Sequence, residues 1–369
     1  MLMNKNDMIR AIERKNPSRV PVWDDYFSLE IMAKHRKQIS NFLEKYEQCF
    51  LLVESGPAGE DQIRVNGKPV LYKAQLGWTA QGKDYPPSPE PRDIWNDEWG
   101  AIWHRAPDGV GGQVKFAPIA DWSNLGDYLQ NKAPRFDQTG RYDFIHDLID
   151  RYPDVYVMSW GLSGPFERMS FLRGMENLLM DFHFNQKNVI MLGEYIAEQF
   201  IHMIHNYAGA GCNGFYFTDD WGSQHGLFIN PETWRKIFKP WYKRFIDECH
   251  KLNMHACMHS CGNIIPIIPD LIDLGLDALH PIQPNAMDQE KVVRQFAGEI
   301  TFWGGLDIQH ILPHGSPDEV SQECKRLIDL FDGPDGGYIA SPANTIMPDT
   351  PLENIERMMQ TFREYGDRK

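Results

Sequence analysis

The feature that most constrains this chain is a regular alternation, through its second half, between short apolar runs and longer amphipathic stretches. The runs are rich in β-branched and aromatic residues, which is typical of buried strands. They cover residues 155–162, 214–220, 255–262, 277–284, 300–307 and 337–343. The stretches between and after them predict helices over residues 188–211, 230–253, 264–275, 288–298, 316–331 and 350–366. Short strands that alternate with helices indicate βα units and a parallel sheet.

We therefore expect an α/β fold, a (β/α)₈ TIM barrel that forms a single domain over residues 1–369, with the "RVPVWDD" segment at 19–25 as an early strand. An open doubly wound sheet is the alternative. No G-x-G-x-x-G segment follows an early strand, which weakens the dinucleotide-binding version of that fold.

Residues 55–120 interrupt the alternation and are rich in Pro, Gly and Trp. We expect an inserted region with a short antiparallel hairpin that forms a lid or wall over the barrel mouth. Trp95, Trp99 and Trp103 are candidates for a wall against a flat ligand, although tryptophans that simply pack within a hairpin explain the pattern as well.

The overall charge narrows the choice of partner. A net charge of −14 argues against a nucleic acid or an anionic membrane surface, because both need basic patches. No apolar run approaches the roughly 18 residues that span a bilayer, and charges occupy the place of a signal-peptide core. The six cysteines are scattered, which favours a cytoplasmic protein with reduced thiols. The sequence itself leaves open whether the protein is a monomer or a homodimer.

Polar side chains concentrate at the carboxyl ends of the predicted strands, where a barrel places its active site. For any one of them, capping of the following helix is an equally good explanation. The set comprises Asp24, Asp25, Asp219, Asp220, His259, Cys261, Gln283, Asp307 and Asn344.

Two pairs within this set carry the chemistry. His259 and Cys261 are two residues apart, so in a strand they point to the same side and could hold a metal, although a packed thiol beside a hydrogen-bonded histidine is the alternative. Asp219 and Asp220 are adjacent, so one of them faces the site as base, metal ligand or substrate anchor and the other caps a loop.

The chain resembles the uroporphyrinogen decarboxylase superfamily, which also contains cobalamin-dependent methyltransferases of the methylcobamide:coenzyme M type. The resemblance lies in segments spread over nearly the whole chain: "RVPVW", "SGPFERMSFLRG", "TDDWGS", "HSCGN", "TFWGGLD" and "PDTPLENI". It implies one TIM barrel with its site at the carboxyl ends of the strands.

Three departures separate this chain from true uroporphyrinogen decarboxylases. The cationic segment that holds substrate carboxylates in those enzymes is replaced here by "WDDYFS". The substrate-contacting Tyr of the family aligns with Phe171, and its His in the last strand-loop aligns with Asn344. The resemblance is therefore closer to the methyltransferase branch.

In that branch a His-x-Cys pair and a distant Cys hold zinc, so the resemblance implies zinc at His259 and Cys261. The distant Cys is replaced by Asn344 in "PANTIMP", and an oxygen ligand from Asn344, Asp220 or Gln224 would make a harder site, better suited to an alcohol or ether oxygen than to a thiol. The resemblance also implies a corrinoid such as methylcobalamin on a partner protein.

The sequence thus predicts a zinc-assisted, corrinoid-linked methyltransferase for a small methylated or methoxylated compound. The alternatives are a metal-free decarboxylase of a small acid or tetrapyrrole and a non-catalytic corrinoid or tetrapyrrole binder. We expect Asp219, Asp220 or Asp25 to act in catalysis. Substrate contacts are expected from Phe171, Trp221, Gln283, Asp307 and Asn344.

Overall fold

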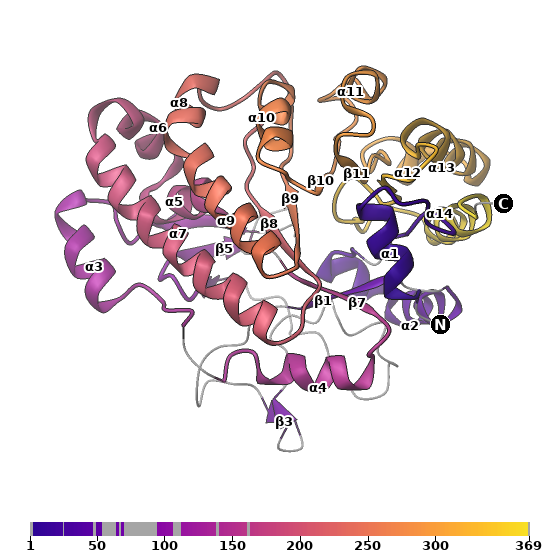
Figure 1. The fold of residues 1–369 in the computed structure, drawn as a ribbon, viewed down its shortest axis with the longest axis horizontal. Coiled ribbons are helices and arrows are strands. Elements are labelled where there is room, and N and C mark those ends of the chain that lie inside the picture. The colour runs from indigo at the N-terminus through magenta and orange to yellow at the C-terminus, as the bar shows by residue number, and fades with distance from the viewer. Residues whose placement is uncertain are drawn as a thin grey trace.

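The computed structural model describes residues 3–24, 26–46, 49–53, 64–65, 68–69, 94–105, 112–137, 140–160 and 163–367. Strands occupy the centre and helices the periphery (Figure 1). The strands are β1 Phe50–Val53, β2 Arg64–Val65, β3 Lys68–Pro69, β4 Ile94–Asn96, β5 Ile102–Arg105, β6 Gly112–Phe116, β7 Tyr156–Ser159, β8 Gly214–Thr218, β9 His255–His259, β10 Ala278–His280, β11 Thr301–Trp303 and β12 Tyr338–Ile339.

The α-helices lie around the strands of the main sheet (Figure 1). They are α1 Lys5–Ile12, α2 Leu29–Lys45, α3 Leu125–Asn131, α4 Asp143–Arg151, α5 Pro165–Arg173, α6 Met175–Phe184, α7 Gln186–Gly209, α8 Pro231–Ile237, α9 Lys239–Lys251, α10 Ile268–Asp273, α11 Gln289–Phe296, α12 Ile311–His314, α13 Pro317–Phe331 and α14 Leu352–Tyr365. Every described helix is either too short or too polar to cross a lipid bilayer.

The main sheet is parallel and its strands follow chain order, β1-β7-β8-β9-β10-β11-β12. An eighth segment closes it. Val22 forms a parallel bridge with Ala340 beyond β12, and its N–H lies 3.0 Å from the thiol of Cys49 beside β1. The sheet is therefore the predicted TIM barrel, and the "RVPVW" segment supplies the predicted early strand. Arg19 forms an antiparallel bridge with Asp367, and an ion pair between Lys45 and Glu356 at 2.6 Å joins α2 to α14, so the described N-terminal and C-terminal segments lie on the same side of the barrel (Figure 1).

The strands are shorter than predicted because their last residues leave the sheet for the loops at the barrel mouth. The run at 255–262, for example, ends as a strand at His259. The helix predicted over 230–253 breaks in two after Ile237, because Pro240 lacks an N–H and fits only the first turn of a new helix.

The inserted region contains the short antiparallel pair β2-β3 and, in addition to the predicted hairpin, a three-stranded antiparallel sheet, β4-β5-β6. Trp95 and Trp103 face each other across β4 and β5 with stacked rings 6.0 Å apart, whereas Trp99 is buried against Phe136. Trp103 also contacts Phe171 of α5 at 4.6 Å. The part of the insert that the structure describes thus packs on α5, at the side of the barrel where the predicted site lies.

Candidate metal centre at the barrel mouth

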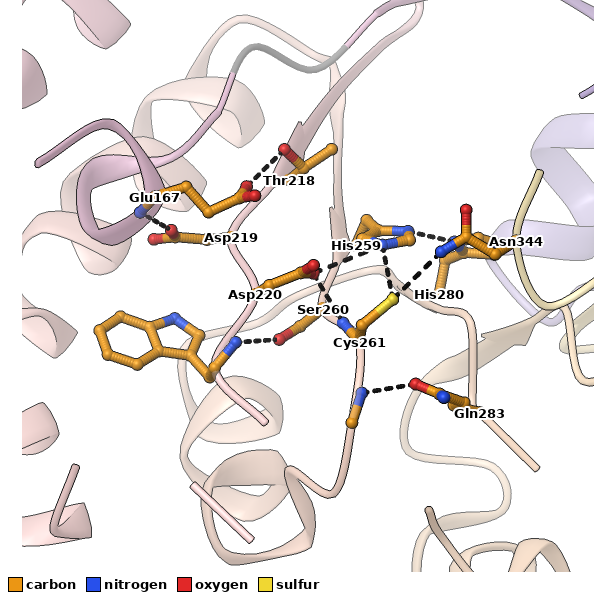
Figure 2. A network of polar contacts seen from close by, with 12 residues as sticks. Glu167, Thr218, Asp219, Asp220, His259, Ser260, Cys261, His280, Gln283 and Asn344 are labelled. Atoms are coloured by element: carbon orange, nitrogen blue, oxygen red, sulfur yellow. Dashed lines mark hydrogen bonds and ion pairs between the residues drawn. The ribbon is translucent and has the colours of Figure 1, made fainter. Parts of the chain in front are cut away.

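Three side chains converge at the carboxyl ends of β8 and β9: His259 ends β9, and Asp220 and Cys261 lie in the loops that follow the two strands. The ligand atoms of Asp220, His259 and Cys261 all lie within 4.8 Å of one another. The Nε2 atom of His259 is 3.2 Å from the sulfur of Cys261 and 3.4 Å from Oδ1 of Asp220. Figure 2 shows the three groups pointing at one place. The structure therefore brings the predicted pair His259 and Cys261 together with one member of the other predicted pair, Asp220.

The pair His259 and Cys261 meets for a reason other than the predicted strand alternation. Cys261 lies in the loop after β9, and Asp220 in the loop after β8 accepts its backbone N–H at 2.8 Å. In a second bond between the two loops, the backbone N–H of Gly222 donates to the carbonyl oxygen of Cys261 at 3.1 Å. The loops thus continue the pairing of β8 and β9 beyond the sheet, and this pairing places the carboxylate beside the thiol.

Two glycines permit this close approach. Gly262 has a φ of +81°, and a Cβ atom there would lie 2.1 Å from the carbonyl oxygen of Gly222. A Cβ atom on Gly222 would lie 2.6 Å from the backbone nitrogen of Asn263. Neither distance is tolerated between real atoms, so the two main chains can touch only because both positions lack a side chain.

The carboxylates of the adjacent residues Asp219 and Asp220 point in different directions and have different hydrogen-bond partners. Asp219 is fully buried, and its carboxylate accepts backbone N–H groups of Phe166 at 3.2 Å and Glu167 at 2.8 Å and the hydroxyl of Tyr242. It therefore caps the start of α5, which has no cap from its own N-cap residue, Gly164. These bonds account for Asp219 as a helix cap, its catalytic role stays a prediction, and Asp220 points toward His259 and Cys261 (Figure 2).

Glu167 is an acid beside the cluster that the sequence interpretation missed. It lies in the first turn of α5, is partly exposed, and accepts the hydroxyl of Thr218 at 2.7 Å. Burial, followed by the nearby charges of Asp220 and Asp219, raises the pKa of Glu167 well above its ordinary value. The surroundings therefore favour the protonated form of this carboxyl group over the ionised form.

Burial also controls the charge of the cluster. It lowers the pKa of His259, against the pull of Asp220, so the imidazole is neutral at pH 7. Burial and the charge of Asp220 raise the pKa of the Cys261 thiol well above its ordinary value, although the side chain of Asn344 donates to the sulfur at 3.3 Å. A carboxylate and a thiolate can share this space only if a cation accompanies them.

An aromatic wall stands next to the cluster. Tyr26 and Trp160 are half-buried and touch edge to face at 5.5 Å, and Tyr26 is stacked on Trp23 at 5.0 Å. Burial raises the pKa of Tyr26 to about 12, against a hydrogen bond with Thr345, and Cys261 contributes to the increase through its charge. Tyr26 therefore lies close enough to the cluster to belong to the same site.

Two residues that were predicted to contact substrate, Gln283 and Asp307, bind to backbone or side-chain groups of the loops at the barrel mouth. Gln283 accepts the N–H of Gly262 at 2.7 Å and so supports the cysteine loop. Asp307 accepts from Asn285, Gln309 and His310 and joins two rim loops. Its predicted substrate contact has no support in these bonds.

Two further predictions concern residues away from the cluster. Trp221 is fully buried, donates to Tyr242 and stacks on Phe166 at 4.2 Å, so its described contacts are core packing and its substrate contact stays a prediction. Asp25 lies outside the described residues, and its neighbour Asp24 is buried in an ion pair with Arg363 of α14.

Comparison with known families gives this site a context. A family model for uroporphyrinogen decarboxylase (URO-D) matches residues 124–365, more than half of the 369 residues. The chain belongs to the uroporphyrinogen decarboxylase family. The resemblance on which the sequence interpretation relied is thereby confirmed.

The curated members of this family that resemble the chain are methyltransferases. A methylated-thiol–coenzyme M methyltransferase of Methanosarcina mazei is 22% identical over 237 residues, which are 62% of this chain and 60% of that protein. The methylcobamide:CoM methyltransferase MtbA of Methanosarcina acetivorans is 24% identical over 140 residues, 37% of this chain and 38% of that protein. The matches thus span less than two thirds of these relatives.

A solved structure supports the fold of this family member. A methyltransferase from Methanosarcina mazei matches it with a TM-score of 0.69, at 17% identity, over 98% of this chain and 99% of that chain. At this identity the likeness establishes the barrel alone.

Proposed function

We propose that this member of the uroporphyrinogen decarboxylase family is a zinc-assisted, corrinoid-linked methyltransferase for a small methylated or methoxylated compound. The observation that carries the proposal is the convergence of Asp220, His259 and Cys261 at the barrel mouth. The methyltransferase names of the relatives add support.

The donor set fits zinc. In a tetrahedral site, Zn–N and Zn–O bonds of about 2.0–2.1 Å and a Zn–S bond of about 2.3 Å separate nitrogen from oxygen by about 3.4 Å and nitrogen from sulfur by about 3.6 Å. The corresponding distances from His259 Nε2 are 3.4 Å to Asp220 and 3.2 Å to Cys261. Only small movements would bring all three atoms to their ligand positions, and a fourth position remains for substrate or Asn344.

The bound ion would act as a Lewis acid on the heteroatom that carries or receives the methyl group. One carboxylate in place of a thiolate makes the centre harder, which favours an oxygen substrate over a soft thiol. Glu167 would supply or accept the proton of that oxygen, because its carboxyl group lies against Thr218 at the end of β8 and its raised pKa favours the form that carries a proton.

Two other parts of the structure would shape the pocket. Tyr26 and Trp160 present ring surfaces next to the cluster, which suit a flat substrate and keep water away. Through Trp103 and Phe171, the insert would form a further wall as part of one 1–369 domain. We also propose a corrinoid protein as partner and, because all six cysteines are free thiols, a cytoplasmic location.

Metal analysis combined with methyl transfer tests the proposal. We expect about one zinc ion per chain in protein purified from zinc-supplemented cells, and loss of the ion in Cys261→Ala. Cys257→Ala is the matched control, because Cys257 is a buried thiol on the same strand outside the cluster. A wild-type protein without metal, or zinc retained by Cys261→Ala, would contradict the metal centre.

Activity is measured as methylation of cob(I)alamin with a panel of methoxylated, N-methylated and S-methylated donors. Glu167→Gln should keep the zinc and slow transfer from methoxylated donors by about 10²–10⁴-fold, the usual contribution of a general acid. If no donor in the panel methylates the cobalt, the transferase proposal fails and the decarboxylase alternative is next to be tested.

A further inference from the structure

A second histidine stands directly behind His259. His280, the last residue of β10, is fully buried, and its Nδ1 atom lies 2.7 Å from Nδ1 of His259. Its other ring nitrogen, Nε2, lies 3.4 Å from the carbonyl oxygen of Pro342. Figure 2 shows His280 on the side of His259 away from Asp220.

These two distances select one arrangement of protons. Where two Nδ1 atoms meet at 2.7 Å, one carries hydrogen and the other accepts it. The carbonyl of Pro342 can only accept, so Nε2 of His280 carries the hydrogen of that neutral ring and its Nδ1 is the acceptor. His259 therefore carries its hydrogen on Nδ1, and its Nε2 lone pair points toward Cys261 and Asp220.

The opposite arrangement has two costs. It would direct the bare Nε2 of His280 at the bare oxygen of Pro342. It would also place a hydrogen on Nε2 of His259, which Asp220 could accept at 3.4 Å but which would have to leave before a metal binds there. Water cannot relieve the first conflict, because the ring of His280 is fully buried and packs against Trp23 at 5.4 Å and Trp303 at 5.2 Å.

We infer that His280 is a positioning residue for the metal centre: it accepts the Nδ1–H of His259 and so holds that ligand with its Nε2 lone pair ready for the ion. The inference deepens the proposed function and rests on its metal site. A hydrogen-bond partner behind a metal-binding histidine fixes its tautomer and ring orientation, and loss of such a partner typically weakens metal affinity by about 10–100-fold.

The same bond connects the centre to the last loop of the barrel. Pro342 belongs to the segment that also carries Asn344, whose amide donates to Cys261 at 3.3 Å. Tyr216 adds a longer contact of 3.3 Å to Nδ1 of His280, and its hydroxyl donates because that nitrogen already serves as an acceptor. A shift of the last loop would therefore reach the zinc ligands by two separate routes.

The test measures metal affinity of the full chain with zinc removed, by competition with a chromogenic chelator for Zn²⁺ and by the visible spectrum of bound Co²⁺. His280→Leu removes the acceptor at similar bulk, and we expect it to weaken Zn²⁺ binding by about 10–100-fold. His280→Asn restores an acceptor oxygen at the position of Nδ1 and should recover most of the affinity. Phe200→Leu, a core change far from the cluster among Phe215 and Phe245, should leave it unchanged.

The ¹⁵N shifts of the His259 ring in metal-free protein provide a readout that general destabilisation does not move. We expect a protonated Nδ1 in wild type and in His280→Asn, and a mixture of tautomers in His280→Leu. Equal Zn²⁺ affinity in wild type and His280→Leu, or a hydrogen on Nε2 of wild-type His259, would overturn this inference alone. Failure of the wild-type protein to bind Zn²⁺ would instead overturn the metal centre itself.

Discussion

Replacement of Asp219 separates a capping role from a catalytic one. Its carboxylate is fully buried and accepts from two backbone N–H groups and from Tyr242. Asp219→Ala removes all of these acceptors. Loss of a helix cap costs about 1 kcal/mol, and a buried tyrosine hydroxyl left without an acceptor adds about 1–3 kcal/mol. We expect the free energy of unfolding to fall by about 2–4 kcal/mol at pH 5.

Asp219→Asn should behave differently, because the amide keeps one acceptor oxygen and does not titrate. Burial raises the pKa of Asp219 from 3.8 to about 7. Because the folded pKa is the higher one, the folded wild-type protein binds the extra proton, and its stability falls as the pH rises from about 4 to about 7. Between pH 5 and pH 7 this single group lowers wild-type stability by about 2 kcal/mol. The asparagine variant therefore gains that amount relative to wild type.

Urea unfolding, followed by tryptophan fluorescence at pH 5 and pH 7, measures both effects. A stability difference between Asp219→Asn and wild type that is the same at the two pH values would refute the pKa argument. Loss of zinc or of methyl transfer in a folded Asp219→Asn protein would show that Asp219 contacts the reacting groups and does more than cap α5.

Three further outcomes follow from the cluster. Zn²⁺ added to metal-free protein at pH 7 should release about one proton, because the raised pKa keeps the Cys261 thiol protonated until the ion binds. The affinity for Zn²⁺ should therefore increase with pH. In the same titration in weak buffer, Cys261→Ser should release no proton. Gly222→Ala removes no ligand, but its added Cβ atom would force the loop of Asn263 away. Zn²⁺ binding, measured by chelator competition, should therefore weaken by about tenfold or more. An unchanged affinity would show that the loops are free to adjust. Asn344→Cys should tighten Zn²⁺ binding by about tenfold or more, since a thiolate would join Cys261, and isothermal titration shows whether it does.

The fold was predictable because its main determinants are local. Apolar runs of strand length alternate with helical periodicity along the chain, and only a parallel sheet with helices outside satisfies that order. Strand ends were less predictable. Whether residues 260–262 continue β9 depends on the backbone of Gly262, whose positive φ turns the chain out of the sheet, and on its contact with Gly222, which is distant in sequence.

The site was predictable only where residues follow strands directly. Asp220, His259 and Cys261 satisfied that rule, and so does His280, which the sequence interpretation passed over although it ends the run "DALH". Alternation indicated that one of Asp219 and Asp220 would face the site. The choice between them depends on the free N–H groups at the start of α5, which no local pattern reveals.

Glu167 illustrates the remaining gap. It belongs to a helix rather than a strand end, and it reaches the site because α5 begins against Thr218 at the end of β8. Glu167 lies within the "SGPFERM" segment that supported the family resemblance. That segment was therefore the available clue to an acid at the start of this helix.

The attachment of the insert to α5 has a consequence for how such enzymes diversify. Arg168 of α5 forms a part-buried ion pair with Asp97 at 2.9 Å, and Phe171 contacts Trp103, while the proposed metal ligands come from the end of β9 and the loops after β8 and β9. The outer wall and the donor set are therefore held by different parts of the chain. If the proposed function is correct, evolution can exchange the wall, and with it the choice of methyl donor, without rebuilding the centre that activates the donor.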